Sequence, residues 1–197
     1  MLVVGLTGGI GSGKTTVGKM FKSFGIPVYL ADKEAKALMH RSKIIKRKLI
    51  ALFGESAYKD GKLNRAFLAS KIFNDKALLS QMNAIVHPKV ASHFKRWLKK
   101  QNAPYIIKEA AIIFENNLEH QYDYIITVIA DKDSRIQRVM KRDSVTQKKV
   151  ESVINNQLSD AEKIRKSDIV ITNNDIKTLE KQVKDIHFSI LKIIKAI

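Results

Sequence analysis

Short apolar runs alternate with helical patterns along this chain of 197 residues. Five runs have the length and composition of buried strands, at residues 2–6, 26–30, 105–109, 124–129 and 168–171. Between them apolar residues recur at helical spacing, and a final helix is expected over residues 176–195. This alternation predicts an α/β fold with a parallel sheet covered by helices on both faces, and with ligands at the carboxyl ends of the strands.

The second and third predicted strands are separated by residues 33–100, which are almost wholly helical in pattern. The pattern has a loop at residues 53–63 and a second break at His87-Pro88. The stretch is too long for a simple crossover between two strands, so we expect an inserted helical subdomain.

A glycine-rich segment, GGIGSGKT, lies between the first predicted strand and the first helix. Gly8, Gly13, Lys14 and Thr15 fill the spacing of a P-loop. Glycines allow successive N–H groups to turn toward a phosphate, and the following helix adds its positive N-terminal end. Lys14 supplies a cation for the terminal phosphates, and Thr15 supplies a hydroxyl for a magnesium ion. The alternative is a turn that merely joins strand to helix, and the correct spacing and flanking elements argue against it.

Composition narrows the class of protein. An apolar content of 45% is ample for a core, and the absence of cysteine excludes disulfides and thiolate metal sites. No apolar stretch approaches the ~20 residues needed to span a membrane, and no basic region precedes the first apolar run. We therefore expect a cytoplasmic protein with no membrane partner.

The formal net charge of +17 is compatible with three kinds of surface. It would attract nucleic acid, it would attract a small substrate carrying several phosphates, and it could simply be a solvated basic surface. The chain has no separate nucleic-acid module and no aromatic-rich basic motif, so we expect no nucleic-acid partner.

Two carboxylates stand at the ends of predicted strands. Asp32 follows the second strand and Glu109 ends the third, so both should approach the phosphate loop at the carboxyl edge of the sheet. A carboxylate there can take a proton from an attacking hydroxyl or hold magnesium. For each carboxylate the alternative is helix capping or solvation of an exposed strand end.

A basic helix is expected over residues 133–143. Arg135, Arg138 and Arg142 lie at offsets of three and seven residues, which places them on one face that we expect to look outward. In a phosphate-transfer enzyme such a face can close over the nucleotide, stabilise developing charge and exclude water. An ordinary solvated basic helix is the alternative.

A series of motifs extends along nearly the whole chain. They are LTGGIGSGKTT, Ala31-Asp32, Phe53-Gly54, the string from Asp60 to Arg65 followed by Leu68 and Ile72-Phe73, Val86-His87-Pro88, Ile113-Phe114-Glu115, Arg138, Arg142-Asp143, Gln157, and Asp168–Ile171 with Asn173-Asn174. In order and spacing these motifs resemble those of the dephospho-CoA kinase family. The resemblance implies ATP-dependent phosphorylation of the ribose 3′-hydroxyl of dephospho-CoA, the last step of coenzyme A synthesis.

The resemblance also implies an architecture, a three-layer P-loop NTPase fold with a parallel five-stranded sheet, a helical acceptor-binding insertion and a lid. The nucleotide-binding core would comprise residues 1–32, 101–135 and 164–197. Residues 33–100 would form the acceptor subdomain, and residues 136–163 would form the lid. We expect dephospho-CoA as the small-molecule partner, and a monomer or weak homo-oligomer.

Roles for individual residues follow from the resemblance together with the positions described above. The expected catalytic residues are Lys14, Asp32 and Arg138, with Asp32 as the base for the 3′-hydroxyl. ATP and Mg²⁺ are the expected cofactors, with Thr15 on the metal and with nucleotide contacts from Gly9, Ile10, Gly11, Ser12, Gly13, Lys14, Thr15, Thr16, Arg142 and Asn174. Substrate contacts are expected from Asp32, Arg65, His87 and Glu109. The remaining histidines, His40, His93, His120 and His187, show no constellation and are expected to be ordinary surface or core residues.

The chain departs from the family pattern at several positions. The segment from Glu109 to Glu115 reads EAAIIFE where many members carry an aspartate and later a proline. Arg135 stands at a position often filled by glutamine, and Lys163 at one often filled by arginine. Another small-molecule kinase is the nearer alternative function, because loop, lid and base are shared while acceptor choice depends on the insertion. A regulatory or nucleic-acid-associated nucleoside triphosphatase is the more distant alternative.

Overall fold

The computed structural model describes residues 1–73 and 75–196. The chain divides into two compact units, one formed by Met1–Leu30 with Asn102–Ile197 and the other by Ala31–Gln101. Each unit has its own apolar core. Within the described residues, no helix combines the length and apolar character needed to cross a membrane.

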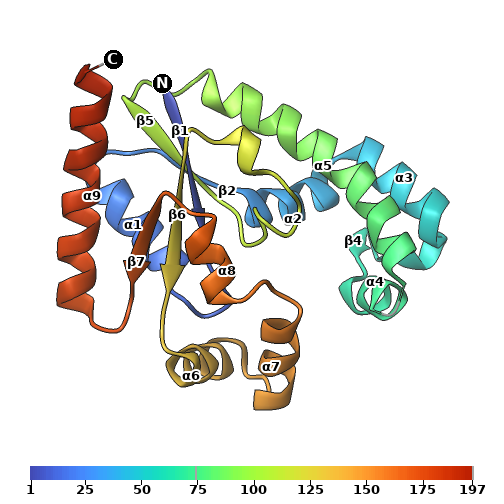
Figure 1. The fold of residues 1–197 in the computed structure, drawn as a ribbon. Coiled ribbons are helices and arrows are strands. Elements are labelled where there is room, and N and C mark those ends of the chain that lie inside the picture. Colours follow the sequence, from blue (N-terminus) through green and yellow to red (C-terminus); the bar gives the residue numbers. More distant parts are fainter. Residues whose placement is uncertain (74, 197) are drawn as a thin grey trace. The chain divides into compact units, whose positions relative to one another are not determined.

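The first unit is built on a five-stranded sheet in the order β2-β5-β1-β6-β7 (Figure 1). Its strands are β1 (Leu2–Thr7), β2 (Val28–Leu30), β5 (Tyr105–Glu109), β6 (Tyr124–Ile129) and β7 (Ile169–Thr172), and all neighbours pair in parallel. β1 lies between β5 and β6, which explains why its sequence is apolar on both faces. The predicted parallel five-stranded sheet is confirmed.

Helices α1 (Lys14–Ser23) and α9 (Ile176–Ala196) cover one face of this sheet (Figure 1). Val17, Phe21, Leu179 and Val183 on these helices are fully buried and pack in one cluster with alternate residues of the strands. On the opposite face, a Cβ at Gly5 would contact Ile113 and Tyr122, and α8 (Asp160–Arg165) packs on β6. The three-layer arrangement follows from strands that are apolar on both sides.

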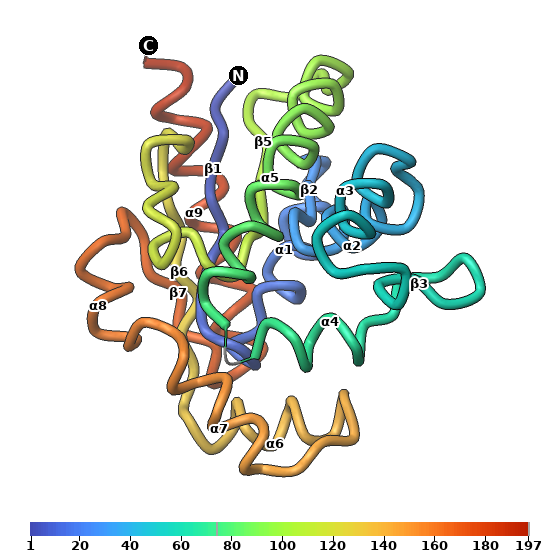
Figure 2. Tube along the Cα trace, turned by 90° about the vertical axis from the view of Figure 1, so that its right-hand side faces the viewer, coloured from blue at the N-terminus to red at the C-terminus, as the bar shows by residue number. Residues whose placement is uncertain are grey.

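Two further helices follow β6 in this unit. α6 (Lys132–Asp143) begins at the N-cap Asp131, whose side chain accepts a hydrogen bond from the Ser134 N–H at 3.0 Å. α7 (Gln147–Asn155) packs beside α6, and the two lie side by side in both views (Figures 1 and 2). A small apolar core of Ile136, Val139 and Val150 joins them.

The second unit contains the helices α2 (Ala31–Arg41), α3 (Lys43–Phe53), α4 (Arg65–Ile72) and α5 (Lys76–Leu98), with a short 3-10 helix η1 (Glu55–Ala57). The loop expected over residues 53–63 is wrong in part, because it contains η1 and a hairpin of β3 (Tyr58–Lys59) and β4 (Lys62–Leu63). Asp60 and Gly61 turn the hairpin with φ of 50° and 74°. Positive φ at both central residues is what an Asp-Gly two-residue turn provides.

The helix break expected at His87-Pro88 is also wrong, because α5 runs from Lys76 to Leu98 through Pro88. Proline removes one backbone hydrogen bond from a helix interior, which is a local loss. Val86 is buried in the core of the second unit, and Val90 packs against that core on the far side of the proline. Burial of this continuous helix face outweighs the local loss.

His187 of α9 is a core residue whose imidazole Nδ1 lies 2.7 Å from the Tyr105 hydroxyl. The ring also stacks on Phe24 at a centroid distance of 4.8 Å. Burial lowers the pKa of His187 below its ordinary value and raises the pKa of Tyr105. Protonation of His187 is therefore less favourable in the folded chain than in the unfolded chain.

We expect this histidine to make the protein less stable in mild acid. As pH falls through about 6.5 the unfolded chain takes up the proton first, so the free energy of unfolding decreases until the lowered folded pKa is passed. His187→Gln should reduce this slope, which for one proton cannot exceed about 1.4 kcal/mol per pH unit. Urea unfolding between about pH 7.5 and 5.5 measures it. The exposed His40→Gln serves as the control, and equal slopes for His187→Gln and the unaltered protein would contradict the expectation.

Candidate functional site

The phosphate loop connects β1 to α1 and is shaped by glycines. Gly11 and Gly13 have φ of 77° and 101°, in the region that favours glycine. A Cβ at Gly13 would also clash with the side-chain amide of Asn173, which donates a hydrogen bond to the Ser12 carbonyl at 2.7 Å. Glycine is therefore required at position 13 by its backbone conformation and by the close approach of the Asn173 side chain, which follows β7.

Lys14 lies over this loop. Its Nζ donates hydrogen bonds to the carbonyl oxygens of Gly8 at 2.8 Å and Gly9 at 3.1 Å. The side chain is half-buried and its ammonium group stays beside the loop that the sequence motif assigns to phosphate. An ammonium group in this position is suited to bind phosphate oxygens.

Thr15 and Glu109 are brought together by the sheet. β5 pairs with β1 so that Glu109 is opposite Leu6, and the Thr15 hydroxyl donates to Glu109 Oε1 at 3.3 Å. Hydroxyl and carboxylate oxygens suit magnesium, which usually also binds substrate phosphates and water. No cluster of three or more His, Asp or Glu side chains able to hold a metal occurs among residues 1–73 and 75–196. The Thr15 hydroxyl and the Glu109 carboxylate are candidate oxygen ligands for a magnesium ion.

Arg138, Arg142 and Asn174 occupy different surroundings. Arg138 Nη2 donates to the carbonyl of Asn173 at 3.1 Å, next to the side chain that supports the loop. Arg142 is exposed and forms two 2.8 Å hydrogen bonds with the adjacent Asp143, which raise its pKa. Asn174 Oδ1 accepts the Asp131 N–H at 3.2 Å.

The expectation that Arg135 looks outward beside Arg138 and Arg142 is wrong. Arg135 is only 5% exposed, and its Nε donates to the carbonyl of Ile10 in the phosphate loop at 2.9 Å. Residues three apart on a helix point in similar but not identical directions. Arg135 therefore points toward the phosphate loop, whereas Arg138 is exposed.

Asp32, Arg65 and His87 belong to the second unit. Asp32 is the second residue of α2 and lies within its first turn, so the alternative in which it is the N-cap of the helix is wrong. His87 lies in α5, where burial lowers its pKa and the charge of Asp32 opposes that shift. The net lowering favours the neutral imidazole at neutral pH. Arg65 is exposed at the first position of α4.

A sequence model of the dephospho-CoA kinase family matches residues 2–178. This chain belongs to the dephospho-CoA kinase family. Two curated dephospho-CoA kinases show the same relationship. The one from Bacteroides fragilis (strain YCH46) is 35% identical over 184 residues, covering 93% of this chain and 90% of the relative. The one from Fusobacterium nucleatum is 36% identical over 186 residues, covering 93% and 96%.

Among solved structures, TT1252 from Thermus thermophilus is similar with a TM-score of 0.89 and 28% identity, over 95% of this chain and 96% of that one. Membership of the dephospho-CoA kinase family makes this protein a kinase, a phosphate-transferring enzyme. It also identifies the glycine-rich loop as a nucleotide-binding P-loop.

Three residues of the dephospho-CoA kinase motifs have contacts that the sequence did not predict. Gln157 Oε1 accepts the Ile10 N–H of the phosphate loop at 2.9 Å, and Asn173 supports Ser12 as described. Glu115 Oε1 accepts hydrogen bonds from Lys163 Nζ at 2.7 Å and from the Leu158 N–H at 3.1 Å. The sequence marks these three residues only as members of the family motifs, and nothing in their local spacing indicates their partners.

Lys163 is fully buried. Its ion pair with Glu115 ties α8 to the segment that follows β5. A buried ion pair is stable only if its two charged groups are close enough to compensate for their lost hydration, and Lys163 Nζ lies 2.7 Å from Glu115 Oε1. Lysine at this position therefore keeps a charged link between these two segments.

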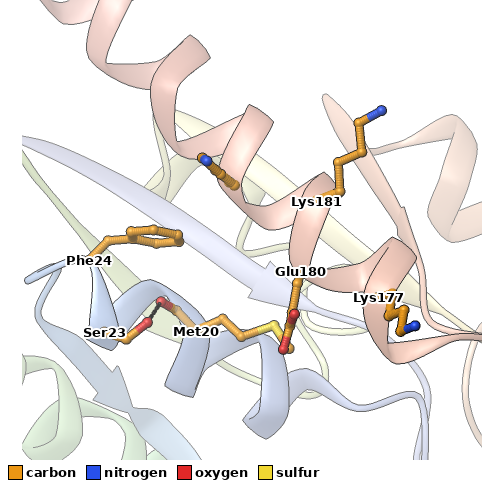
Figure 3. A pocket seen from close by; sticks show the side chains of 7 residues that line it. Met20, Ser23, Phe24, Lys177, Glu180 and Lys181 are labelled. Carbon is orange, nitrogen blue, oxygen red and sulfur yellow. Dashed lines mark hydrogen bonds between the residues drawn. The ribbon is translucent and has the colours of Figure 1, made fainter.

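A hollow of about 470 Å³ lies between the end of α1 and α9. Figure 3 shows Met20, Ser23 and Phe24 on one side and Lys177, Glu180 and Lys181 on the other. The phosphate loop precedes the opposite end of α1, so this hollow is separate from the loop.

Proposed function

We propose that this protein transfers the terminal phosphoryl group of ATP to the ribose 3′-hydroxyl of dephospho-CoA, the final step of coenzyme A biosynthesis. The match of the dephospho-CoA kinase family over residues 2–178 carries the assignment of the acceptor. The phosphate loop with Lys14 over its carbonyls supports ATP as the donor. The absence of cysteine fits a reducing compartment and supports a cytoplasmic location.

We assign the nucleotide to the phosphate loop. Backbone N–H groups of residues 9–16 would bind the phosphates, and Lys14 would neutralise charge on the terminal ones. Thr15 would hold Mg²⁺, with Glu109 beside it, and the bound ion would supply further charge neutralisation. Arg138, held near Asn173, would contact the transferred group, and Arg142 and Asn174 would lie nearer the adenine.

We assign the acceptor to the second unit. Asp32 would orient the 3′-hydroxyl and take its proton as the new bond to phosphorus forms. A neutral His87, together with Arg65, would contribute to acceptor binding. In this proposal residues 1–32, 101–135 and 164–197 form the nucleotide-binding core, residues 33–100 the acceptor subdomain, and residues 136–163 a lid.

Phosphate transfer from ATP to a panel of acceptors tests the assignment. The panel contains dephospho-CoA, nucleoside monophosphates and shikimate, each with and without Mg²⁺. We expect transfer to dephospho-CoA alone, and only with the metal. Preference for another acceptor would favour a different small-molecule kinase, whereas tight single-stranded DNA binding at physiological salt would favour a nucleic-acid-associated enzyme.

The proposed lid predicts unequal roles for basic residues on α6 and α7. Arg138→Ala and Arg142→Ala should each lower kcat/KM by about tenfold or more, the scale of one lost charged hydrogen bond, while Lys149→Ala should have little effect. Lys149 is an exposed cation on α7 and serves as the matched control. Steady-state kinetics with ATP and dephospho-CoA measure all three. Small and equal effects would assign this face to an ordinary solvated surface.

A further inference from the structure

Ile10, at the tip of the phosphate loop, is held by three separate contacts from the segments that follow β6. Its carbonyl accepts a hydrogen bond from Arg135 Nε at 2.9 Å, and its N–H donates to Gln157 Oε1 at 2.9 Å. Its side chain packs against the apolar core that joins α6 and α7. Both polar groups of one residue in the loop are therefore fixed by side chains from outside the loop.

The guanidinium of Arg135 also shapes the neighbouring residues of the loop. A Cβ at Gly9 would overlap the end of the guanidinium, and a Cβ at Gly11 would meet the backbone carbonyl of Arg135. The loop thus lies directly against this arginine over three consecutive residues. Movement of Arg135 would remove the surface on which residues 9–11 rest.

Asp160 is the counterion of this arginine. Arg135 Nη1 lies 3.1 Å and 2.9 Å from the two carboxylate oxygens of Asp160, which is 32% exposed in its side chain. Asp160 is in the first turn of α8, where a capping box of Ser159 and Glu162 fixes the helix start. A buried guanidinium that loses its carboxylate is strongly destabilised, so Arg135 depends on Asp160 for its place.

We propose that Arg135 is a positioning residue that holds residues 9–11 of the phosphate loop in the conformation that binds ATP, with Asp160 as its obligatory partner. The ion pair joins α6 to α8, the helices before and after α7, and Arg135 connects both of them to Ile10 of the phosphate loop. Arg135 does not contact the reacting atoms in this assignment. The inference rests on the proposed use of ATP, but it is independent of which acceptor the enzyme phosphorylates.

Binding of a non-hydrolysable ATP analogue with Mg²⁺ tests the inference by calorimetry, without any acceptor. Arg135→Gln should raise the dissociation constant by about tenfold or more, the scale of a lost hydrogen bond to a charged group. Arg135→Lys should recover part of the affinity, since it restores the charge but cannot reproduce both contacts. Asp160→Asn should weaken binding in the same direction. Lys141→Gln, an exposed change on the same helix, is the control and should bind normally.

Two further readouts separate positioning from a purely structural role. The double variant Arg135→Gln with Asp160→Asn should weaken binding no more than Arg135→Gln alone, because the two residues act as one unit. The KM for ATP should rise in each variant while the KM for dephospho-CoA stays near its original value. If Arg135→Gln does not fold, Asp160→Asn carries the test. A folded Asp160→Asn protein with unaltered analogue affinity, or with only a lower melting temperature, overturns the proposal.

Discussion

Lys14→Ala should lower kcat for phosphate transfer by about a hundredfold or more, the scale of losing one preorganised electrostatic contact to a transition state. This loss is expected because of where the Lys14 side chain lies. The Lys14 ammonium group lies over the loop carbonyls, where a phosphate would replace them as partners. Alanine keeps the helix start, because it is an excellent helix former.

Single-turnover rates with saturating ATP and dephospho-CoA measure this effect, and circular dichroism checks the fold. Lys19→Ala is the matched control, since Lys19 is an exposed lysine in the same helix and has no contact with the loop in our assignment. A folded Lys14→Ala protein that turns over at nearly the original rate would show that the loop does not hold the transferred phosphate.

Asp32→Asn should lower turnover by about a hundredfold or more, the upper part of the range for general-base loss, with little change in ATP affinity. Asparagine retains the shape of aspartate but cannot accept the proton of the 3′-hydroxyl. Removal of the carboxylate should also lower the pKa of His87 further, because the Asp32 charge opposes the effect of burial. An NMR titration of His87 measures this further lowering, and an unchanged His87 pKa in the variant would show that the Asp32 charge does not act on the imidazole.

Glu34→Gln provides the control for Asp32. Glu34 is a carboxylate in the same first turn of α2, but it pairs with Arg41 at 3.0 Å. Its replacement should leave turnover nearly unchanged. If Asp32→Asn turns over within severalfold of the unaltered protein, Asp32 is a spectator and Glu109 becomes the candidate base. A magnesium titration of Glu109→Gln would then distinguish a base from a group that assists the metal.

The sheet and the phosphate loop could be predicted because their signals are local. Each strand is a short apolar run, and the loop has a fixed spacing of glycine, lysine and threonine between a strand and a helix. Glu109 was expected near the loop from its place at a strand end, and the parallel register does bring it within reach of Thr15. The order of the strands along the chain and the spacing of apolar residues were sufficient to predict these features.

Other features depend on contacts that no local pattern encodes. The spacing of Arg135, Arg138 and Arg142 is consistent with a shared helix face, but which arginine turns inward depends on where the phosphate loop packs against α6. Pro88 was expected to end a helix, and burial of α5 on both sides of it prevented this. The Asp60-Gly61 pair is an exception, because an Asp-Gly pair is a local signal for a two-residue hairpin turn, and the structure has such a turn between β3 and β4.

The position of the transferred phosphate shows which hydroxyl of the acceptor the enzyme phosphorylates. The protein is incubated with ATP, Mg²⁺ and dephospho-CoA, and the product is analysed by phosphorus NMR and mass spectrometry. We expect one new phosphomonoester on the ribose 3′-hydroxyl, formed together with an equal amount of ADP. Release of free phosphate without a phosphorylated acceptor, or phosphate on any other hydroxyl, would contradict it.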